Sequence, residues 1–315
     1  MKRYLVKRLL VAVLVLLVVT VAVFSMLHLT PGDPVTAMLS EDIVDPSVAA
    51  SLRKQLGLDQ PVVIQYLRWL GRVVRGDLGY SFRARKPVAQ MIGERILVTL
   101  ELSLVSMALA VLLAILPGIL AALRRNSVWD FMVSAFAALG ISMPAFWLGI
   151  ILILIFAVRL KWFPPSGFVD LGQGLYTHLS YLVLPAFTLG LSYAAILARF
   201  VRAAVLDVLS EDYVRTAHSK GLPNPQVVRR HALANAWLPI VTVVALETGR
   251  LLGGAVLTET IFAIPGLGRL AVSAVLGRDF PVLQAVTMIM ATALIMANLL
   301  ADVIYVFLDP RIRYG

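Results

Sequence analysis

The sequence predicts an all-α membrane protein whose chain crosses the bilayer six times. Of its 315 residues, 60% are hydrophobic and 15% are charged, whereas a soluble domain has about 45–50% apolar and about 25% charged residues. The mean hydropathy is +0.88. Six apolar runs approach the roughly 20 residues that a helix needs to cross the hydrocarbon core of a bilayer. These runs are residues 9–29, 96–123, 131–158, 181–198, 237–257 and 282–307.

The remaining composition excludes several other classes of protein. The net charge of +10 and the isoelectric point near 10.1 would fit a nucleic-acid-binding protein, but the basic residues are spread between the apolar runs rather than gathered in one patch. The chain has no cysteine, so disulfides, thiolate metal sites and cysteine nucleophiles are excluded. Its four histidines show no metal-ligand spacing, and we expect structural roles for them.

The first apolar run follows a basic amino end, residues 2–8. The run is longer than the core of a secretory signal, and no small-residue cleavage site follows it, so we expect an uncleaved membrane helix. Residues 30–93 then form a polar region of mixed charge. Helical spacing at residues 46–56 and 61–74 predicts two short helices there, in an extracytoplasmic insertion between the first two membrane helices.

Prolines and polar turns interrupt the later runs. The third run contains Ser142-Met-Pro144, which predicts a kinked helix. Residues 161–167 combine aromatic residues with prolines, which is typical of the membrane interface. The polar turn 262–270 separates the fifth run from the sixth.

The basic residues of the short loops predict the orientation of the chain. Six crossings place both termini on one side of the membrane, and this side carries most of the arginines and lysines of the short segments. Such an excess is typical of the cytoplasmic side. The opposite short loops hold only Arg159, Lys161, Arg269 and Arg278. We therefore expect both termini in the cytoplasm.

Between the fourth and fifth runs lies a polar stretch, residues 209–239. Ser210 can cap a helix over residues 211–220, whose first turn carries two acidic residues that favour a helix start. Gly221 can adopt the left-handed conformation that ends a helix, and Pro223 prevents its continuation. Because a helix of about ten residues is marginal alone in water, we expect it to dock into a partner.

This stretch resembles the cytoplasmic coupling loop of ABC-importer permeases, in particular of the dipeptide, oligopeptide and nickel subfamily. That subfamily reads Tyr-Val-Arg-Thr-Ala-x-x-Lys-Gly-Leu, which matches residues 213–222. The broader consensus Glu-Ala-Ala is not kept, because Arg215 and Thr216 replace its first two residues. The resemblance implies that a helix over residues 211–222 enters a cleft of a separate ATPase subunit, the alternative being a solvated loop. The residues implied in coupling are Glu211, Asp212, Tyr213, Arg215, Thr216, Ala217, Lys220, Gly221 and Leu222.

Further motifs extend the resemblance over nearly the whole chain. None is specific alone, but their order and spacing are similar to those of the B-type permease of peptide importers. They are Pro31-Gly-Asp-Pro34, Leu56-Gly-Leu-Asp-Gln-Pro61, Gly76-Asp-Leu-Gly-Tyr-Ser81, Pro265-Gly-Leu-Gly268, Arg278-Asp-Phe-Pro281 and Asp309-Pro-Arg-Ile-Arg-Tyr314. The resemblance implies the type I ABC-importer permease fold. Residues 1–93 would form the first helix and the extracytoplasmic loop, 94–310 the permease domain, and 311–315 a cytoplasmic tail.

The resemblance also implies a function and a set of partners. The chain would form half of a pore for di- or oligopeptides in the cell membrane of a bacterium or archaeon. A homologous second permease, two ATPase subunits and an extracytoplasmic binding protein would complete the transporter. No Gly-x-x-x-x-Gly-Lys-Ser/Thr motif occurs in this chain, so we expect no cofactor and no enzymatic activity here, with ATP and Mg²⁺ bound by the partner subunits. Glutathione, nickel chelates and oligosaccharides are alternative substrates of the same architecture.

Two other classes of protein fit the sequence less well. A secondary transporter would more often show inverted repeats with broken helices, and we find no convincing internal repeat. An intramembrane hydrolase would carry a Gly-x-Ser-x-Gly motif or paired membrane aspartates, and neither signature occurs. Copurification of ATPase subunits would separate the importer from the secondary transporter.

The fifth run contains two ionisable residues, Glu247 and Arg250. One charge at the centre of a membrane helix costs about 2.5–3.5 kcal/mol on insertion scales, and the i,i+3 spacing lets the two side chains pair on one face. Two hypotheses follow. The pair is either a self-neutralised packing element, or it lines the pore or its gate and meets the charged ends of a peptide. Glu101, Asn298 and Asp302 are further candidates for the same lining.

Overall fold

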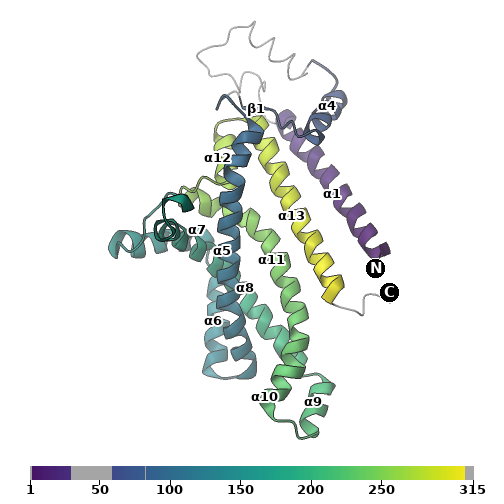
Figure 1. The fold of residues 1–315 in the computed structure, drawn as a ribbon, viewed down its shortest axis with the longest axis vertical. Coiled ribbons are helices and arrows are strands. Elements are labelled where there is room, and N and C mark those ends of the chain that lie inside the picture. Colours follow the sequence, from purple (N-terminus) through teal and green to yellow (C-terminus); the bar gives the residue numbers. More distant parts are fainter. Residues whose placement is uncertain (1, 30–58, 82, 309–315) are drawn as a thin grey trace.

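The structure, a computed structural model, describes residues 2–29, 59–81 and 83–308, with side chains from residue 6 to residue 303. It is almost entirely helical (Figure 1). Within the described residues, five helices are long and apolar enough to cross a membrane, and a bent pair of helices makes six if it is counted as one crossing. The predicted all-α membrane fold is therefore confirmed. The long helices are α1 (Lys2–Leu29), α5 (Val88–Leu123), α8 (Leu175–Leu209), α11 (Leu233–Ile261) and α13 (Phe280–Leu308).

The bent pair corrects the prediction of a single kinked third helix. Helix α6 (Val128–Ser142) ends before Pro144, and α7 (Ala145–Leu152) continues into a π-helical segment, η1 (Ile153–Arg159). The two arms meet at 103°. Proline has no backbone N–H to donate and disfavours helical geometry in the residue before it. The chain therefore breaks at this point instead of bending, and α7 projects sideways from the bundle (Figure 1).

Several helices extend beyond their apolar runs. Helix α5 begins at Val88, so the expected boundary between residues 93 and 94 falls inside a continuous helix. Helix α8 spans Leu175–Leu209 and is much longer than the apolar run 181–198. Hydropathy detects only the part of a helix that suits the hydrocarbon core, whereas the polar ends of these helices are held by contacts with their neighbours.

Helices α5 and α8 pack closely through small residues. A Cβ atom added to Gly118 would lie 2.8 Å from the side chain of Val201, and one added to Gly190 would lie 2.8 Å from the backbone oxygen of Ser106. Close approach of backbones is the main source of helix association where lipid replaces water. The other fully buried small residues of this contact are Ala110, Ala114, Ala121, Ala194 and Ala198.

The predicted short helix at residues 61–74 is present as α4 (Val62–Val74). It packs on α1, where the hydroxyls of Thr20 and Tyr66 lie 2.8 Å apart and His28 Nε2 lies 3.1 Å from the side-chain oxygen of Gln65. Gln65 is buried in this contact. The other predicted helix, residues 46–56, lies outside the described residues.

A small hairpin, which the sequence did not predict, precedes α5. Strands β1 (Tyr80–Ser81) and β2 (Lys86–Pro87) pair antiparallel. The hydroxyl of Ser81 donates a hydrogen bond of 2.5 Å to the carboxylate of Asp279, just before α13. Two of the sequence motifs, Gly76–Ser81 and Arg278–Pro281, therefore meet at this point and attach the hairpin to the last helix.

The region predicted as a polar turn, residues 262–270, also contains the start of a helix, α12 (Leu267–Leu276). Its first turn surrounds the fully buried carboxylate of Glu259. This carboxylate accepts hydrogen bonds from the hydroxyl of Thr99 at 2.7 Å and from the backbone N–H of Arg269 at 3.0 Å. The Thr99 hydroxyl in turn accepts from the backbone N–H of Leu267 at 2.8 Å. The carboxylate thereby joins α5, α11 and the start of α12.

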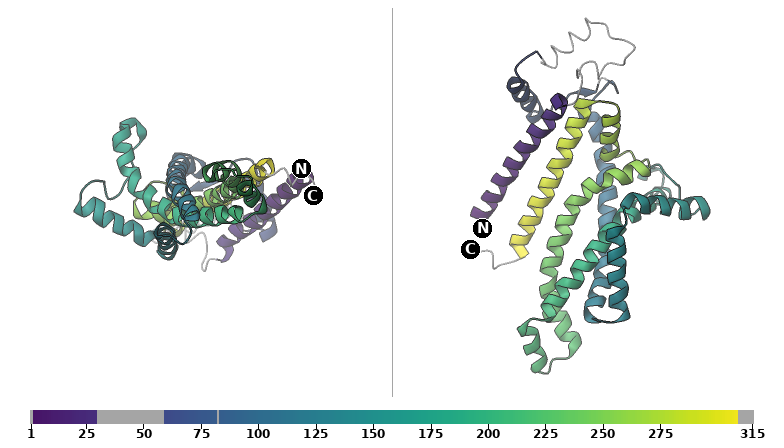
Figure 2. Two further views of the ribbon diagram at one scale, coloured as in Figure 1. Left: turned by 90° about the horizontal axis from the view of Figure 1, so that it is seen from below. Right: turned by 180° about the vertical axis from the view of Figure 1, so that it is seen from behind.

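The remaining elements lie at the lower end of the bundle in Figure 1. Helices α9 (Asp212–Ser219) and α10 (Asn224–Val227) project beyond the ends of α1 and α13, and a π-helical segment, η3 (Val228–Ala232), leads into α11. Figure 2 shows the same arrangement from behind. The amino end of α1 and the carboxyl end of α13 point toward this end, whereas α4 and the hairpin lie at the other. A short 3₁₀ turn, η2 (Leu171–Gln173), precedes α8.

Candidate coupling segment and charged groups of the membrane helices

Helix α9 is shorter than predicted and starts differently. It spans Asp212–Ser219, about 12 Å at 1.5 Å per residue. Ser210 does not cap it, because its hydroxyl donates to the backbone oxygen of Asp207 at 2.7 Å and so closes the end of α8. Glu211 occupies the position before the first helical residue instead. The prediction that Ser210 is the cap was therefore wrong, because the preceding helix extends far enough to use its hydroxyl.

The end of α9 follows the prediction. Gly221 has a φ of +78°, in the left-handed region that glycine adopts without strain. Its backbone N–H donates to the oxygen of His218 at 2.9 Å, and Pro223 follows in an extended conformation. A Cβ atom on Gly221 would meet nothing within 4 Å, so glycine is favoured here by backbone geometry and not by space.

The coupling segment, residues 211–222, is held by a small apolar cluster. Val214 and Ala217 of α9 are buried together with Val227 of α10, and Leu209 and Leu222 pack against them. This cluster fixes one face of α9 on its own neighbours. Of the residues expected to take part in coupling, Ala217 therefore supports the helix from inside, and Leu222 is half-buried.

The opposite face of α9 is exposed to solvent. Arg215 forms an i,i+3 ion pair of 3.0 Å with Asp212, and both side chains are exposed. The hydroxyl of Thr216 donates to the backbone oxygen of Asp212 at 2.9 Å. An exposed face on a short helix at the tip of the molecule is available for docking. The other exposed members of the set are Glu211, Tyr213, Lys220 and Gly221.

Glu247 and Arg250 form the ion pair expected from their spacing, with 2.8 Å between Arg250 Nη1 and Glu247 Oε1. The two side chains differ in environment, because Glu247 is 7% exposed and Arg250 is 69% exposed. The guanidinium of Arg250 is thus bound to the buried carboxylate of Glu247, while most of the arginine side chain is exposed on the surface of α11. Tyr193 of α8 lies one turn further along, where its hydroxyl would be 2.9 Å from a Cβ atom on Gly254.

Asn298, one of the other candidates, lies against the face of α11 that carries Gly249, about 200° around the helix from Glu247. The side-chain oxygen of Asn298, on α13, would lie 3.5 Å from a Cβ atom on Gly249. Asp302 instead pairs with Arg8 at 3.2 Å, where α1 and α13 contact each other.

Glu101 also lies away from the Glu247–Arg250 pair. It is close in sequence to Thr99, which binds Glu259. Glu259 lies twelve residues along α11 from Glu247, which is about 18 Å along a helix axis. Glu101 and Asp302 therefore belong to other contacts.

Glu101 makes a contact with His178 that the sequence analysis missed. The imidazole Nε2 of His178 lies 2.6 Å from Glu101 Oε1, and Nδ1 lies 2.6 Å from the backbone oxygen of Val169. A carbonyl oxygen only accepts, so Nδ1 carries a proton, and the carboxylate needs a second proton between itself and Nε2. The only signal in the sequence is that both residues are ionisable and lie next to apolar runs.

This contact leads to a prediction about pH. As pH rises, loss of the shared proton leaves two acceptors facing each other, so we expect the melting temperature of the purified protein to fall by about 2–4 °C through this step. Glu101→Gln should remove the pH dependence, because the amide can donate to neutral Nε2. Glu94→Gln, an exposed carboxylate of the same helix, is the matched control and should behave as wild type. Identical pH profiles for wild type and Glu101→Gln would contradict the assignment.

A second missed contact joins α6 to α8. Arg202 binds both carboxylate oxygens of Asp130, with 2.9 Å between Nη2 and Oδ2. The backbone N–H of Asn126 donates to the same carboxylate at 3.0 Å. Asp130 is buried. The bidentate pair therefore fastens the turn between α5 and α6 to the part of α8 that leads into the coupling segment.

Comparison with known proteins identifies the family. Residues 114–314 match the family described as the binding-protein-dependent transport system inner membrane component, and residues 1–103 match its described N-terminal region. The chain belongs to this family of ABC-transporter permeases. It is therefore the membrane subunit of a transporter and not itself a catalytic enzyme.

Similar proteins and structures agree with this assignment of the permease. This permease is 39% identical to the probable peptide ABC transporter permease protein of Sinorhizobium fredii over 311 residues, 99% of each chain. It is 43% identical to the glutathione transport system permease protein of Escherichia coli over 314 residues, all of each chain. The inward-facing MetNI methionine ABC transporter matches 71% of this chain and 98% of its own, with a TM-score of 0.60 and 19% identity. An amino acid ABC transporter crystallised with histidines matches 69% of this chain and 93% of its own, with a TM-score of 0.53 and 16% identity.

These structural matches confirm the type I importer permease fold. The permease is a multi-pass protein of the inner membrane. The interpretation of the polar stretch 209–239 as a coupling loop, and the roles of single residues in it, stay predictions. Among the described residues, no cluster of His, Asp or Glu could hold a metal ion.

Proposed function

We propose that this permease forms half of the translocation pore of an ATP-driven importer of short peptides. The observation that carries the proposal is the coupling segment, a short helix that is held by its own apolar cluster and projects beyond the bundle with one face exposed. In this proposal the exposed face docks into an ATPase subunit. A homologous second permease completes the pore, and a second ATPase and an extracytoplasmic binding protein complete the transporter. ATP and Mg²⁺ bind to the ATPase subunits and not to this chain.

The substrate class is supported by the relatives and by the charges of α11. The names of two relatives give a peptide and glutathione, itself a short peptide, as what those proteins transport. In this permease the exposed guanidinium of Arg250 suits the carboxylate of a peptide, and Glu247 keeps that guanidinium in place. We therefore assign Glu247 and Arg250 to the pore lining.

The proposed topology places both termini and the coupling segment in the cytoplasm. In support, the amino end of α1, the carboxyl end of α13 and α9 all lie toward one end of the bundle (Figure 1). Helix α4 and the hairpin, at the other end, then face the binding protein. Arg72 of α4 is exposed, whereas Gln65 is buried against α1, so Arg72 is the suitable position for a crosslinker that tests this contact.

The function is tested by purification and reconstitution. Tagged permease should copurify with ATPase subunits and a second permease, and the reconstituted complex should take up glutathione or trialanine only with its binding protein and ATP. Uptake that is driven by a proton or sodium gradient in the absence of ATPase subunits would instead identify a secondary transporter.

A double substitution tests the role of the pair on α11. Glu247→Gln with Arg250→Met leaves no buried charge unpaired, so the complex should assemble normally. Uptake should fall about tenfold or more, since a hydrogen bond to a charged group contributes about 1.5–3 kcal/mol and 1.4 kcal/mol is a factor of ten. Arg8→Met with Asp302→Asn, which removes the ion pair between α1 and α13, is the matched control and should keep its uptake. Full uptake by the first variant would show that the Glu247–Arg250 pair is only a packing element.

A further inference from the structure

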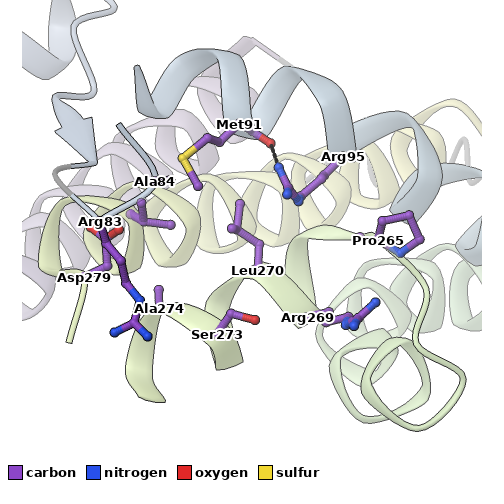
Figure 3. Close-up of a pocket in the computed structure, with 12 residues that line it drawn as sticks. Arg83, Ala84, Met91, Arg95, Pro265, Arg269, Leu270, Ser273, Ala274 and Asp279 are labelled. Atoms are coloured by element: carbon purple, nitrogen blue, oxygen red, sulfur yellow. Dashed lines mark hydrogen bonds between the residues drawn. The ribbon is translucent and has the colours of Figure 1, made fainter. Parts of the chain in front are cut away.

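A cavity of about 520 Å³ opens at the end of the bundle that carries α4 and the hairpin. It lies between the start of α5, helix α12 and the loop that joins the two strands (Figure 3). Met91, Leu270, Ala274 and Val282 form its apolar lining. The cavity includes neither the coupling segment nor the Glu247–Arg250 pair, so the proposed function does not account for it.

Three arginines from three separate segments line this cavity: Arg83 of the hairpin loop, Arg95 of α5 and Arg269 of α12. Figure 3 shows them around the apolar residues Met91 and Leu270. Each donates one N–H to a backbone carbonyl oxygen, at 3.2, 2.8 and 2.6 Å respectively. Because a guanidinium carries five N–H donors, these bonds position the three groups and leave further donors for a ligand.

The lining has an excess of positive charge. Among the described residues, the guanidinium groups of Arg83 and Arg269 have no carboxylate within 4 Å, and that of Arg95 has only Glu94, at 3.6 Å on the surface. Asp279 is the one acidic residue of the lining, and its carboxylate already accepts the hydroxyl of Ser81. Three arginines and one aspartate give the lining a formal charge of +2.

Such a lining selects a particular kind of ligand. Guanidinium groups bind carboxylates through paired hydrogen bonds, and a cavity of this volume is within the range of about 300–1,000 Å³ for small-molecule sites. In a terminal residue of a peptide the carboxylate and the side chain share one Cα atom, so both fit where arginines border an apolar surface. In a phospholipid, polar glycerol esters separate the phosphate from the apolar chains.

We propose that this cavity binds the carboxylate end of a short peptide, at a site separate from the pore pair on α11. Peptide as the ligand class rests on the proposed function, whereas the preference for a carboxylate rests on the three arginines. The site would hold a peptide at the end of the permease remote from the coupling segment, before the peptide reaches Arg250.

The test measures binding of trialanine to the full-length permease, purified with the subunits that accompany it and placed in phosphatidylcholine nanodiscs. Calorimetric titration should show binding that weakens about tenfold when trialanine is replaced by its C-terminal amide. This comparison needs no mutation. Arg95→Gln with Arg269→Gln should weaken trialanine binding to the same extent and should not weaken binding of the amide further.

Two variants serve as controls. Arg278→Gln removes an exposed arginine at the same end of the bundle that does not line the cavity, and it should bind trialanine as wild type does. Glu247→Gln with Arg250→Met removes the pair on α11 and should also keep this binding. Loss of binding in the second control alone would place the carboxylate in the pore and overturn the proposal.

The remaining outcomes distinguish a peptide site from a lipid site, and the failure of this site from the failure of the proposed function. Equal binding of trialanine and its amide would overturn the proposal. Phosphatidylglycerol that copurifies with wild type but not with the arginine variant, without trialanine binding, would overturn it in favour of a lipid site. ATP-driven uptake without trialanine binding would remove the site and leave the proposed function intact. Arginine-dependent binding in a permease that recruits no ATPase would support the site and remove the proposed function.

Discussion

Gly221→Pro should abolish uptake while leaving the amount of membrane-inserted permease nearly unchanged. Gly221 has a φ of +78°, and the ring of proline restricts φ to about −65°. Proline also removes the N–H that donates to the oxygen of His218. The chain would therefore leave α9 in a different direction, and the exposed face of the coupling segment would no longer match its partner. Uptake and substrate-stimulated ATP hydrolysis by the reconstituted complex are the measurements.

A matched substitution separates backbone geometry from side-chain size. Gly221→Asn adds a larger side chain, but asparagine adopts the left-handed conformation more readily than other residues. A Cβ atom at this position meets nothing within 4 Å, so this variant should keep most of its uptake. Wild-type uptake and ATPase stimulation in Gly221→Pro would show that residues 211–222 do not couple the permease to its ATPases.

Gly268→Ala should greatly reduce the amount of folded permease. A Cβ atom at Gly268 would lie 2.5 Å from the Cα atom of Val256 and 3.0 Å from a carboxylate oxygen of Glu259. The backbone of α11 cannot move away at low cost, so the start of α12 must shift and release the buried carboxylate. Overpacking costs about 1–3 kcal/mol, and removing the partners of a buried charge costs about 3–5 kcal/mol. Fluorescence-detected gel filtration and the melting temperature in detergent measure the loss.

The control for this variant is Gly253, a glycine of the neighbouring helix α11. A Cβ atom at Gly253 meets nothing within 4 Å, and alanine favours a helix by about 1 kcal/mol over glycine. Gly253→Ala should therefore keep or slightly raise the melting temperature. A folded Gly268→Ala variant with the melting temperature of wild type would show that the Glu259 carboxylate does not hold the start of α12.

The membrane helices could be predicted well because hydropathy reports a local property of the chain. Residues 9–29 and 282–307 are apolar for long enough that only a membrane helix satisfies their backbone hydrogen bonds in lipid. The third helix was predicted less well. Pro144 indicated a change of direction, but its size depends on what the two arms contact, and the structure has a break of 103° in place of a kink.

The candidate site was predictable to a similar extent. The end of α9 at Gly221 and the ion pair between Glu247 and Arg250 follow from local rules of helix termination and i,i+3 spacing, and both are present. The assignment of Glu101 and Asp302 to the same lining as this pair did not follow from such rules. Their partners, His178 and Arg8, are far away in sequence, and no pattern within one helix identifies them.

The sequence by itself determined the positions of the long apolar helices, the segment that projects from them and the family, because hydropathy, helix-ending residues and motif order are all local along the chain. Only the tertiary structure decided how distant charges are paired. Glu259 lies 160 residues from Thr99 and Asp279 lies 198 residues from Ser81, and each of these polar groups is buried at low cost only when its distant partner is in place. The three arginines of the cavity likewise come from three segments, and only folding places them around one cavity.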